Sequence, residues 1–272
     1  MTMPAAIRWG DILMNQNKLR KYLANLPLRE IKYLDSTGST NDEALAWAAN
    51  DAKDLSVVIA DEQTAGRGRL DRKWFTPPGT ALAFSVILRP TAAERAQLSR
   101  IVGLAALAIM DALMKRGLSP QVKWPNDILL NGRKVAGVLV ESVWSGDQVD
   151  CVVIGIGVNV LKGAVPAQNV LQFPATSLED ALGHPVERLE VLRDILGALI
   201  ALRPQLGEDE FIMKWEQGLA YRGKQVQVET EAGGSFVGYI SGLEKDGSLR
   251  LNDQGGKSLT VQFGDVRLRP SA

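Results

Sequence analysis

The sequence is poor in the side chains that most enzymes use for nucleophilic, acid–base and metal chemistry. Its 272 residues include one cysteine, Cys151, and one histidine, His184. A single cysteine excludes an internal disulfide bond, and the scarcity of both residues excludes a Cys/His zinc site and a cysteine–histidine dyad. Cys151 lies in an apolar run that predicts a buried strand, and its glycine and proline neighbours place His184 in a turn. Any catalysis is therefore expected from lysine, arginine, carboxylate and backbone groups, or from a bound metal ion.

Charge and hydropathy exclude further classes of protein. The formal net charge is zero, which argues against a broad nucleic-acid-binding surface because such surfaces are strongly basic. The first 30 residues show no signal-peptide pattern, and no apolar run is long enough to span a bilayer. We therefore expect a soluble, cytoplasmic protein that does not bind a membrane.

Positive charge is concentrated in one loop, residues 63–74, which reads Gln-Thr-Ala-Gly-Arg-Gly-Arg-Leu-Asp-Arg-Lys-Trp. Gly66 and Gly68 open the loop, and glycine permits φ > 0 and close approach to a ligand. Guanidinium groups offer forked donors that match carboxylate and phosphate oxygens. A solvated turn between strands is the alternative, but it does not explain so many like charges. We interpret the loop as a lid over a small anion, with the cations Arg67, Arg69, Arg72 and Lys73.

Apolar periodicity predicts a large mixed domain followed by a small β-rich one. Strands are expected over 31–35, 56–61, 80–88 and 149–160, and helices over 15–26, 41–49, 94–116, 187–202 and 209–217. After Arg222, short β-type runs alternate with glycine-bearing turns, which is typical of a small barrel. The predicted organisation is a short N-terminal helical extension over 1–30, a first domain over 31–217 and a second over 218–272.

Two polar segments leave alternatives open. Thr40 and Glu43 have the spacing of a capping box, which would start the helix over 41–49. Capping alone explains Ser39, Thr40 and Asn41, but polar groups at a helix start can equally hold a ligand.

Asn131-Gly132 predicts a two-residue hairpin. The predicted register pairs Leu130 with Arg133, Leu129 with Lys134 and Asp127 with Ala136. Asp127 and Lys134 then share one face of the hairpin. A lysine entering an apolar strand needs an anionic partner, either Asp127 or a ligand.

Taken in order, these motifs resemble those of the biotin protein ligases, also called biotin–[biotin carboxyl carrier protein] ligases. The matching pieces are Ser-Thr-Asn at 39–41, Gly-Arg-Gly-Arg-X-X-Arg-X-Trp at 66–74, Lys-Trp-Pro-Asn-Asp at 123–127, Gly-Arg-Lys-Val-Ala-Gly-Val-Leu-Val-Glu at 132–141 and Gly-Ile-Gly-Val-Asn at 155–159. The resemblance covers roughly residues 31–270. It implies an α/β (α+β) fold in which helices flank a mixed sheet, as in class II aminoacyl-tRNA synthetases, followed by an SH3-like β-barrel.

The resemblance implies a two-step reaction. Biotin and ATP first give biotinyl-5′-AMP and pyrophosphate, with Mg²⁺ as the accompanying ion. A lysine of a biotin carboxyl carrier protein, a domain of a carboxylase, then accepts the biotin. Such a reaction depends on alignment of the reactants and on stabilisation of charge, so it needs clustered cations and does not need a histidine.

The resemblance also implies roles for particular residues. The biotin-binding residues would be Ser39, Thr40, Asn41, Gln63, Gly66, Arg67, Gly68, Arg69, Lys134 and Gly137. The residues for ATP and the adenylate would be Arg69, Arg72, Trp74, Lys123, Asn126, Asp127, Asn159 and Arg269, with Arg267 as the alternative to Arg269. Lys134, Arg67 and Arg69 would be catalytic, and Asp127 is the candidate metal ligand.

Other functions remain to be weighed. Lipoate–protein ligases share the catalytic fold and form an acyl-adenylate, but the arginine loop and the β-rich tail favour biotin. A non-catalytic biotin-sensing regulator is a second alternative, because some members carry an N-terminal DNA-binding domain. Only about thirty residues precede the catalytic pattern, so DNA binding is not expected here. A homodimer is possible, although the sequence does not locate its interface.

Overall fold

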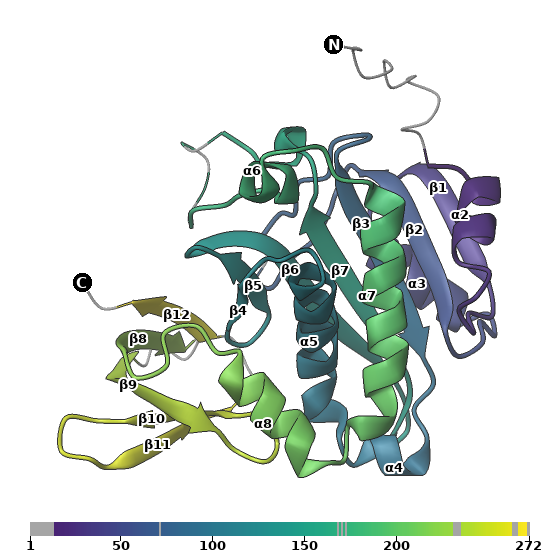
Figure 1. Cartoon of the computed structure of the whole chain (residues 1–272). Helices are drawn as coiled ribbons and strands as arrows, with labels where there is room; N and C mark the ends of the chain where they lie inside the picture. The colour runs from purple at the N-terminus through teal and green to yellow at the C-terminus, as the bar shows by residue number, and fades with distance from the viewer. Residues whose placement is uncertain are drawn as a thin grey trace.

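The main structural element is a seven-stranded mixed sheet (Figure 1). In the computed structural model, residues 14–70, 72–167, 169, 171, 173–230, 235–262 and 266–270 are described, the side chains of 230 and 266–270 excepted. The strands are β1 (Ile31–Thr37), β2 (Ser56–Gln63), β3 (Ala81–Leu88), β4 (Pro120–Lys123), β5 (Asp127–Leu130), β6 (Arg133–Ser145) and β7 (Gln148–Asn159), in the order β1-β2-β3-β7-β6-β5-β4. β1 and β2 are parallel, and every other neighbouring pair is antiparallel. The predicted mixed sheet is confirmed.

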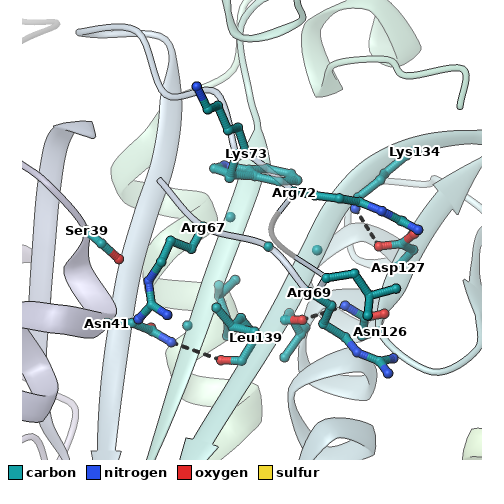
Figure 2. Close-up of a pocket in the computed structure, with 18 of the residues that line it drawn as sticks. Ser39, Asn41, Arg67, Arg69, Arg72, Lys73, Asn126, Asp127, Lys134 and Leu139 are labelled. Carbon is teal, nitrogen blue, oxygen red and sulfur yellow. Dashed lines mark hydrogen bonds and ion pairs between the residues drawn. The ribbon is translucent and has the colours of Figure 1, made fainter. Parts of the chain in front are cut away.

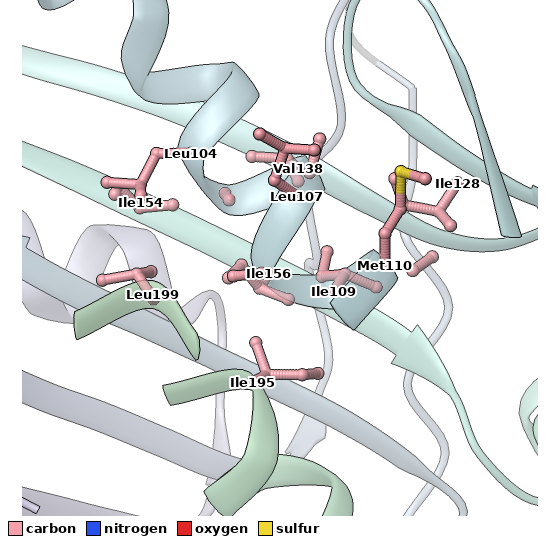
Figure 3. Close-up of a cluster of buried hydrophobic side chains, with 14 of the residues drawn as sticks. Leu104, Leu107, Ile109, Met110, Ile128, Val138, Ile154, Ile156, Ile195 and Leu199 are labelled. Carbon is pink, nitrogen blue, oxygen red and sulfur yellow. The ribbon is translucent and has the colours of Figure 1, made fainter. Parts of the chain in front are cut away.

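Helices cover both faces of this sheet. α5 (Ile101–Met114) and α7 (Arg188–Leu202) pack on one face, and α3 (Thr40–Ala48) packs on the other (Figure 1). β7 shows the alternation that separates the two faces, because Ile154 and Ile156 join the α5/α7 core while Cys151 and Val153 pack with α3. Figure 3 shows the larger core, in which each fully buried aliphatic side chain contributes about 1.5–3 kcal/mol.

The predicted long helix over 94–116 is wrong, because the segment forms three elements. They are α4 (Ala92–Arg95), the 3₁₀ turn η1 (Leu98–Arg100) and α5. The buried guanidinium of Arg100 donates to the carbonyl oxygens of Leu206 (2.6 Å) and Lys245 (2.8 Å). These contacts come from segments far away in the chain, and they outweigh the local preference for one continuous helix.

The remaining helical elements lie around the sheet. They are α2 (Gln16–Tyr22), η2 (Lys162–Ala164), α6 (Leu178–Leu182), η4 (Arg203–Gln205) and α8 (Asp209–Gln217). α2 lies beside β1, where the side-chain amide of Gln16 donates to Ile31 O (2.7 Å) and accepts from Tyr33 N (3.0 Å). It thereby occupies backbone groups of an edge strand that would otherwise be open to pairing. The helices of the described residues are all too short, or too polar, to cross a membrane.

A second sheet follows α8. It is antiparallel, with the order β11-β10-β9-β8-β12, and its strands are β8 (Gln225–Thr230), β9 (Ser235–Leu243), β10 (Leu249–Asn252), β11 (Ser258–Val261) and β12 (Val266–Pro270). β12 was not predicted, since its sequence Val-Arg-Leu-Arg-Pro combines two charges with a proline. The outer strands β11 and β12 do not pair within the described residues, so the predicted closed barrel is not observed. The indole of Trp124 donates to Gly247 O (3.0 Å) and ties this sheet to the first one.

Candidate active site

A pocket lies on the α3 face of the large sheet, between the start of α3, the 66–74 loop and the β5–β6 hairpin (Figure 2). Its floor is formed by β6 and β7. It is lined by Ser39, Thr40, Asn41, Gln63, Arg67, Gly68, Arg69, Leu70, Arg72, Lys73, Trp74, Lys123, Trp124, Pro125, Asn126, Asp127, Lys134, Gly137, Val138, Leu139, Gly155, Ile156 and Gly157. Segments as far apart in the chain as Ser39 and Gly157 therefore meet in one pocket.

The end of the pocket beside α3 presents neutral polar side chains that are held by hydrogen bonds. Gln63 Oε1 accepts from Thr40 N (2.8 Å) and lies 3.1 Å from Thr40 Oγ1. Asn41 Nδ2 donates to Glu141 Oε2 (2.7 Å) and Leu139 O (3.3 Å). Ser39, Thr40 and Asn41 are each less than 5% exposed. Buried polar groups with fixed partners can orient a neutral ligand by directed hydrogen bonds.

Gly155 explains how Asn41 can lie so close to the sheet. A Cβ atom at position 155 would overlap the Asn41 side-chain oxygen. The space that this glycine leaves is therefore filled by the Asn41 side chain. Any larger residue would push the start of α3 away from the pocket floor.

The predicted capping box is wrong, so capping does not account for the polar residues at the start of α3. Ser39 is the N-cap of α3, and its side chain makes no capping hydrogen bond. The Glu43 carboxylate instead accepts from Lys32 Nζ (2.7 Å) and Thr37 Oγ1 (3.1 Å). Thr40 N donates instead to Gln63 Oε1, both Ser39 and Thr40 line the pocket, and Figure 2 shows Ser39 turned towards it.

The arginine loop is a small hairpin, and neither of its glycines has positive φ. Trp74 N donates to Gly66 O (2.8 Å), and Gly68 N donates to Arg72 O (2.7 Å). Positive φ, expected at Gly66 and Gly68, is found at Leu70 instead (φ 58°). Gly66 is needed for another reason, because a Cβ there would overlap the Trp74 carbonyl oxygen.

Arg67 fastens this hairpin to the body of the protein. Its guanidinium donates to both Glu141 oxygens (2.9 and 3.1 Å) and to Asp42. Burial by itself would lower the pKa of Arg67, but the carboxylates of Glu141 and Asp42 outweigh burial and raise it. Arg67 therefore carries a fixed charge beside the neutral end of the pocket.

Trp74 forms a wall over the pocket floor. A Cβ atom at Gly157 would overlap its indole ring, so this glycine makes the space for it. Lys134 Nζ lies 5.2 Å from the centre of the same ring, within cation–π range.

The far end of the pocket is ionic. Asp127 Oδ1 lies 2.5 Å from Lys134 Nζ, and Asp127 Oδ2 lies 3.5 Å from Lys123 Nζ. Burial by itself would raise the pKa of Asp127, but the two lysines outweigh it and hold the pKa below its ordinary value. Asp127 is therefore an anionic partner of Lys134 in the structure.

The predicted register of the hairpin is correct next to the turn and wrong beyond it. Leu130 pairs with Arg133 and Leu129 with Lys134, and both turn residues have positive φ. A bulge between Ile128 and Leu129 then shifts the pairing, so Asp127 faces Gly137 rather than Ala136. The bulge still leaves the two charged groups in contact.

Two predicted residues lie outside the lining of the pocket, and a third falls on a side chain that the structure does not describe. Asn159, at the end of β7, donates from Nδ2 to Thr176 O (3.1 Å) and does not line the pocket. Gly66 supports the hairpin from outside the lining. Arg269 belongs to β12, and its side chain and that of Arg267 lie outside the described residues. Asn126 lines the pocket and donates to Val138 O (2.7 Å).

The pocket is strongly cationic. Its described lining residues contribute six basic side chains and a single carboxylate, that of Asp127. Such a site attracts a polyanion and stabilises negative charge as it develops. Clusters of three or more potential metal ligands are absent from the described residues, and both oxygens of Asp127 are engaged by lysines. The residues thus fit Asp127 as a partner that positions lysines better than as a metal ligand.

Two residues of this site were missed by the sequence analysis. Glu141 holds both Asn41 and Arg67, and the alternation from Gly137 through Leu139 along β6 would have placed it on the pocket face. Ser85 lies behind Thr40 and Asn41 on β3. No local signal could have indicated it, because its position depends on which strands are neighbours.

Comparison with known proteins agrees with this geometry. The profile of the Biotin/lipoate A/B protein ligase family matches residues 33–159. A biotin–[acetyl-CoA-carboxylase] ligase of Paracoccus denitrificans is 39% identical over 236 residues, covering 83% of this chain and 95% of that protein. A bifunctional ligase/repressor BirA of Bacillus spizizenii is 34% identical over 228 residues, covering 82% of this chain and 70% of the relative.

A solved structure extends the likeness to most of the chain. The biotin protein ligase from Aquifex aeolicus, in complex with biotin and ATP, matches with a TM-score of 0.78 and 29% identity, and the match covers 90% of this chain and 100% of that one. The expected resemblance is therefore confirmed: this chain belongs to the biotin protein ligases of the biotin/lipoate A/B protein ligase family.

Proposed function

We propose that this protein is an ATP-dependent biotin–protein ligase that activates biotin as biotinyl-5′-AMP and transfers it to a lysine of a carrier protein. One observation carries the proposal. A neutral hydrogen-bonding site and a lysine-rich ionic site meet in one pocket, under a hairpin that supplies four further cations. The neutral end suits an uncharged heterocycle, and the ionic end suits a carboxylate beside a polyphosphate.

The first step joins two anions. A carboxylate oxygen of biotin attacks the α-phosphorus of ATP, the bond to the bridging oxygen breaks, and pyrophosphate leaves. Lys134 is the group we assign to the reacting oxygens, since Asp127 fixes its ammonium group beneath Trp74. Arg67 and Arg69, from the lid, would neutralise the charge that develops on the phosphate. Ground-state repulsion between the two anions is thereby reduced.

The second step needs protection of the intermediate. Biotinyl-5′-AMP is a mixed anhydride that water would hydrolyse, so the 66–74 hairpin gains a role as a lid. A neutral lysine amine of the carrier then attacks the acyl carbon, the bond to AMP breaks, and the amine loses a proton. Arg72, Trp74, Lys123 and Asn126 would hold the nucleotide portion at the ionic end.

Finer assignments follow from the same proposal. The catalytic domain would comprise residues 31–217, and residues 218–272 would form an SH3-like barrel domain that reaches the nucleotide through Arg269 or Arg267. Mg²⁺ would be carried by the nucleotide phosphates, whose negative charge it would help to neutralise. The carrier would be the biotin carboxyl carrier domain of a carboxylase. The protein would act in the cytoplasm, and it would do so as a monomer or as a homodimer.

Mass spectrometry of a carrier domain tests the proposal. After incubation with this protein, biotin and Mg-ATP, the carrier should gain the mass of one biotinyl group on one lysine. Replacing that lysine by arginine is the matched control and should abolish the gain. Lipoylation without biotinylation, in parallel incubations, would identify a lipoate ligase instead. No modification with either vitamin would contradict a ligase of either kind.

A further inference from the structure

A buried serine hydroxyl stands directly behind the neutral end of the pocket. Ser85, on β3, is 0% exposed and does not line the pocket. Its Oγ atom lies 2.6 Å from Asn41 Oδ1 and 2.8 Å from Thr40 Oγ1. It therefore contacts two residues of the pocket wall without reaching a ligand itself.

The direction of these hydrogen bonds follows from which atoms can donate. Asn41 Nδ2 faces two acceptors, the Glu141 carboxylate at 2.7 Å and Leu139 O at 3.3 Å, so the amide is oriented with Oδ1 towards Ser85. An amide oxygen only accepts. Ser85 therefore donates its single hydroxyl proton to Asn41.

The same count fixes the Thr40 hydroxyl. Two hydroxyl protons, those of Ser85 and Thr40, serve three oxygen–oxygen contacts: 2.6 Å (Ser85–Asn41), 2.8 Å (Ser85–Thr40) and 3.1 Å (Thr40–Gln63). One contact must lack a proton, and the longest is the least costly to leave without one. Thr40 then donates to Ser85, and its remaining lone pairs lie beside Gln63 Oε1.

The geometry points to Ser85 as a positioning residue that makes the Thr40 hydroxyl a hydrogen-bond acceptor towards the ligand. The inference rests on the proposed function, in which the ligand is biotin and the group that Thr40 meets is an N–H of its cyclic urea. An N–H is attracted to the adjacent oxygens of Thr40 and Gln63. A ring oxygen in its place would face their lone pairs and be rejected.

Ligand analogues and one substitution test this together. The analogues are the two isomeric cyclic carbamates in which one or the other urea N–H of biotin is replaced by a ring oxygen. For the wild-type protein, the isomer that lacks the N–H facing Thr40 should have a KM in pyrophosphate release at least about tenfold above that of biotin, as loss of one buried hydrogen bond implies. We call this ratio of KM values the preference. Ser85→Ala frees the Thr40 proton, so the preference should shrink to about threefold or less.

Two controls separate positioning from general damage. Ser56, on β2, is also 0% exposed, and its hydroxyl has no hydrogen-bond partner within the described residues. Ser56→Ala should leave both the preference and the biotin KM unchanged. In a Thr40→Val background, Ser85→Ala should change the preference by less than about twofold, since the group that it orients is gone. The KM for ATP should not change in Ser85→Ala.

The outcomes are distinguishable. If wild type discriminates between the isomers and Ser85→Ala retains the full preference, while its biotin and ATP KM values rise together, then Ser85 is a structural residue only and the inference is overturned. If Ser85→Ala does not fold, as judged by thermal unfolding, Ser85→Cys replaces it, because a thiol is a weak donor and should give an intermediate preference. If wild type releases no pyrophosphate with biotin, the proposed function itself fails.

Discussion

The two ends of the pocket hold their ligand-facing groups in opposite ways. Beside α3, the ligand-facing groups are the neutral side chains of Thr40, Asn41 and Gln63, joined by directed hydrogen bonds, and Thr40 and Asn41 are nearly fully buried. Beside the β5–β6 hairpin, they are charged and joined by ion pairs through Lys134, Lys123 and Asp127. Direction is needed to recognise a ring, whereas charge is needed to bring two anions together. The arrangement places each kind of interaction where the proposed chemistry requires it.

β7 shows how one strand serves both ends. Gly155 leaves space for Asn41 at the neutral end, and two residues later Gly157 leaves space for Trp74 at the ionic end. On the opposite face of the same strand, Ile154 and Ile156 are fully packed in the core. The face of β7 that borders the pocket is therefore the one on which glycines leave space for side chains from other segments.

The largest expected effect is at the ionic end. Lys134→Ala should lower adenylate formation by about 100- to 1,000-fold, since it removes a fixed charge aimed at the reacting oxygens. Asp127 keeps Lys123 as a partner, so the free energy of unfolding should fall by only about 1–3 kcal/mol. Pyrophosphate release and denaturant unfolding measure the two effects. Arg133→Ala, an exposed neighbour outside the pocket lining, is the control. A wild-type rate in Lys134→Ala would remove this residue from the mechanism.

The two glycines of β7 test whether the ends are separable. Gly155→Ala should weaken biotin binding by about tenfold or more and ATP binding much less, because the added methyl group displaces Asn41. Gly157→Ala should do the reverse, because it displaces Trp74. Calorimetry with each ligand alone gives both affinities, and each variant is the control for the other. Equal losses of both ligands in both variants would show that the pocket responds as one unit.

Local patterns in the sequence predicted much of the fold. The strands and most helices followed from apolar periodicity, and the hairpin turn followed from Asn131-Gly132. Much of the lining of the pocket followed from the resemblance to biotin protein ligases. In contrast, the break before α5 depends on Arg100 reaching carbonyl groups more than a hundred residues away. Local patterns do not contain such contacts.

The unpredicted parts of the site have the same origin. Ser85 and Glu141 join the network only because β3, β7 and β6 are adjacent in the sheet. The bulge at Ile128 moves the register by one residue without any glycine or proline to announce it. Positive φ, which is uncommon in a non-glycine residue, appears at Leu70 and not at Gly66 or Gly68. Each of these features is set by tertiary packing.

Salt should affect ligand binding at the two ends of the pocket differently, and this effect should be smaller than those of the glycine substitutions. Raising the ionic strength from about 0.05 M to about 0.5 M should weaken ATP binding several-fold, because the exposed cations of the lid are screened. Biotin binding should change about twofold or less, since its ring meets buried neutral groups. Calorimetric titrations at each salt concentration give both slopes. A steeper dependence for biotin than for ATP would reverse the assignment of the two ends.

The smallest expected effect concerns acid stability. The pKa of Asp127 is lowered in the folded protein, so its ionised form stabilises the fold above the unfolded pKa of about 3.9. That contribution is lost as the pH falls through the lower, folded value. In Asp127→Asn, the free energy of unfolding should therefore decrease less steeply on acidification. Denaturant unfolding over the acid range measures the slope, and a slope as steep as that of wild type would contradict the prediction.

Glu94 offers a matched control far from the pocket. Its pKa is also lowered, because Arg203 and the Thr91 backbone outweigh the effect of burial. Glu94→Gln should flatten the same acid slope while leaving pyrophosphate release unchanged. Only Asp127→Asn should alter both.

The most direct test of the account is a single-turnover measurement without a carrier protein. Mixed with biotin and ATP, the enzyme should release close to one pyrophosphate per active site in a rapid burst, then stop, because the adenylate stays sealed beneath the 66–74 hairpin. Omitting biotin should abolish the burst. Absence of any biotin-dependent pyrophosphate would contradict activation in this pocket, and steady release without a burst would contradict its protection.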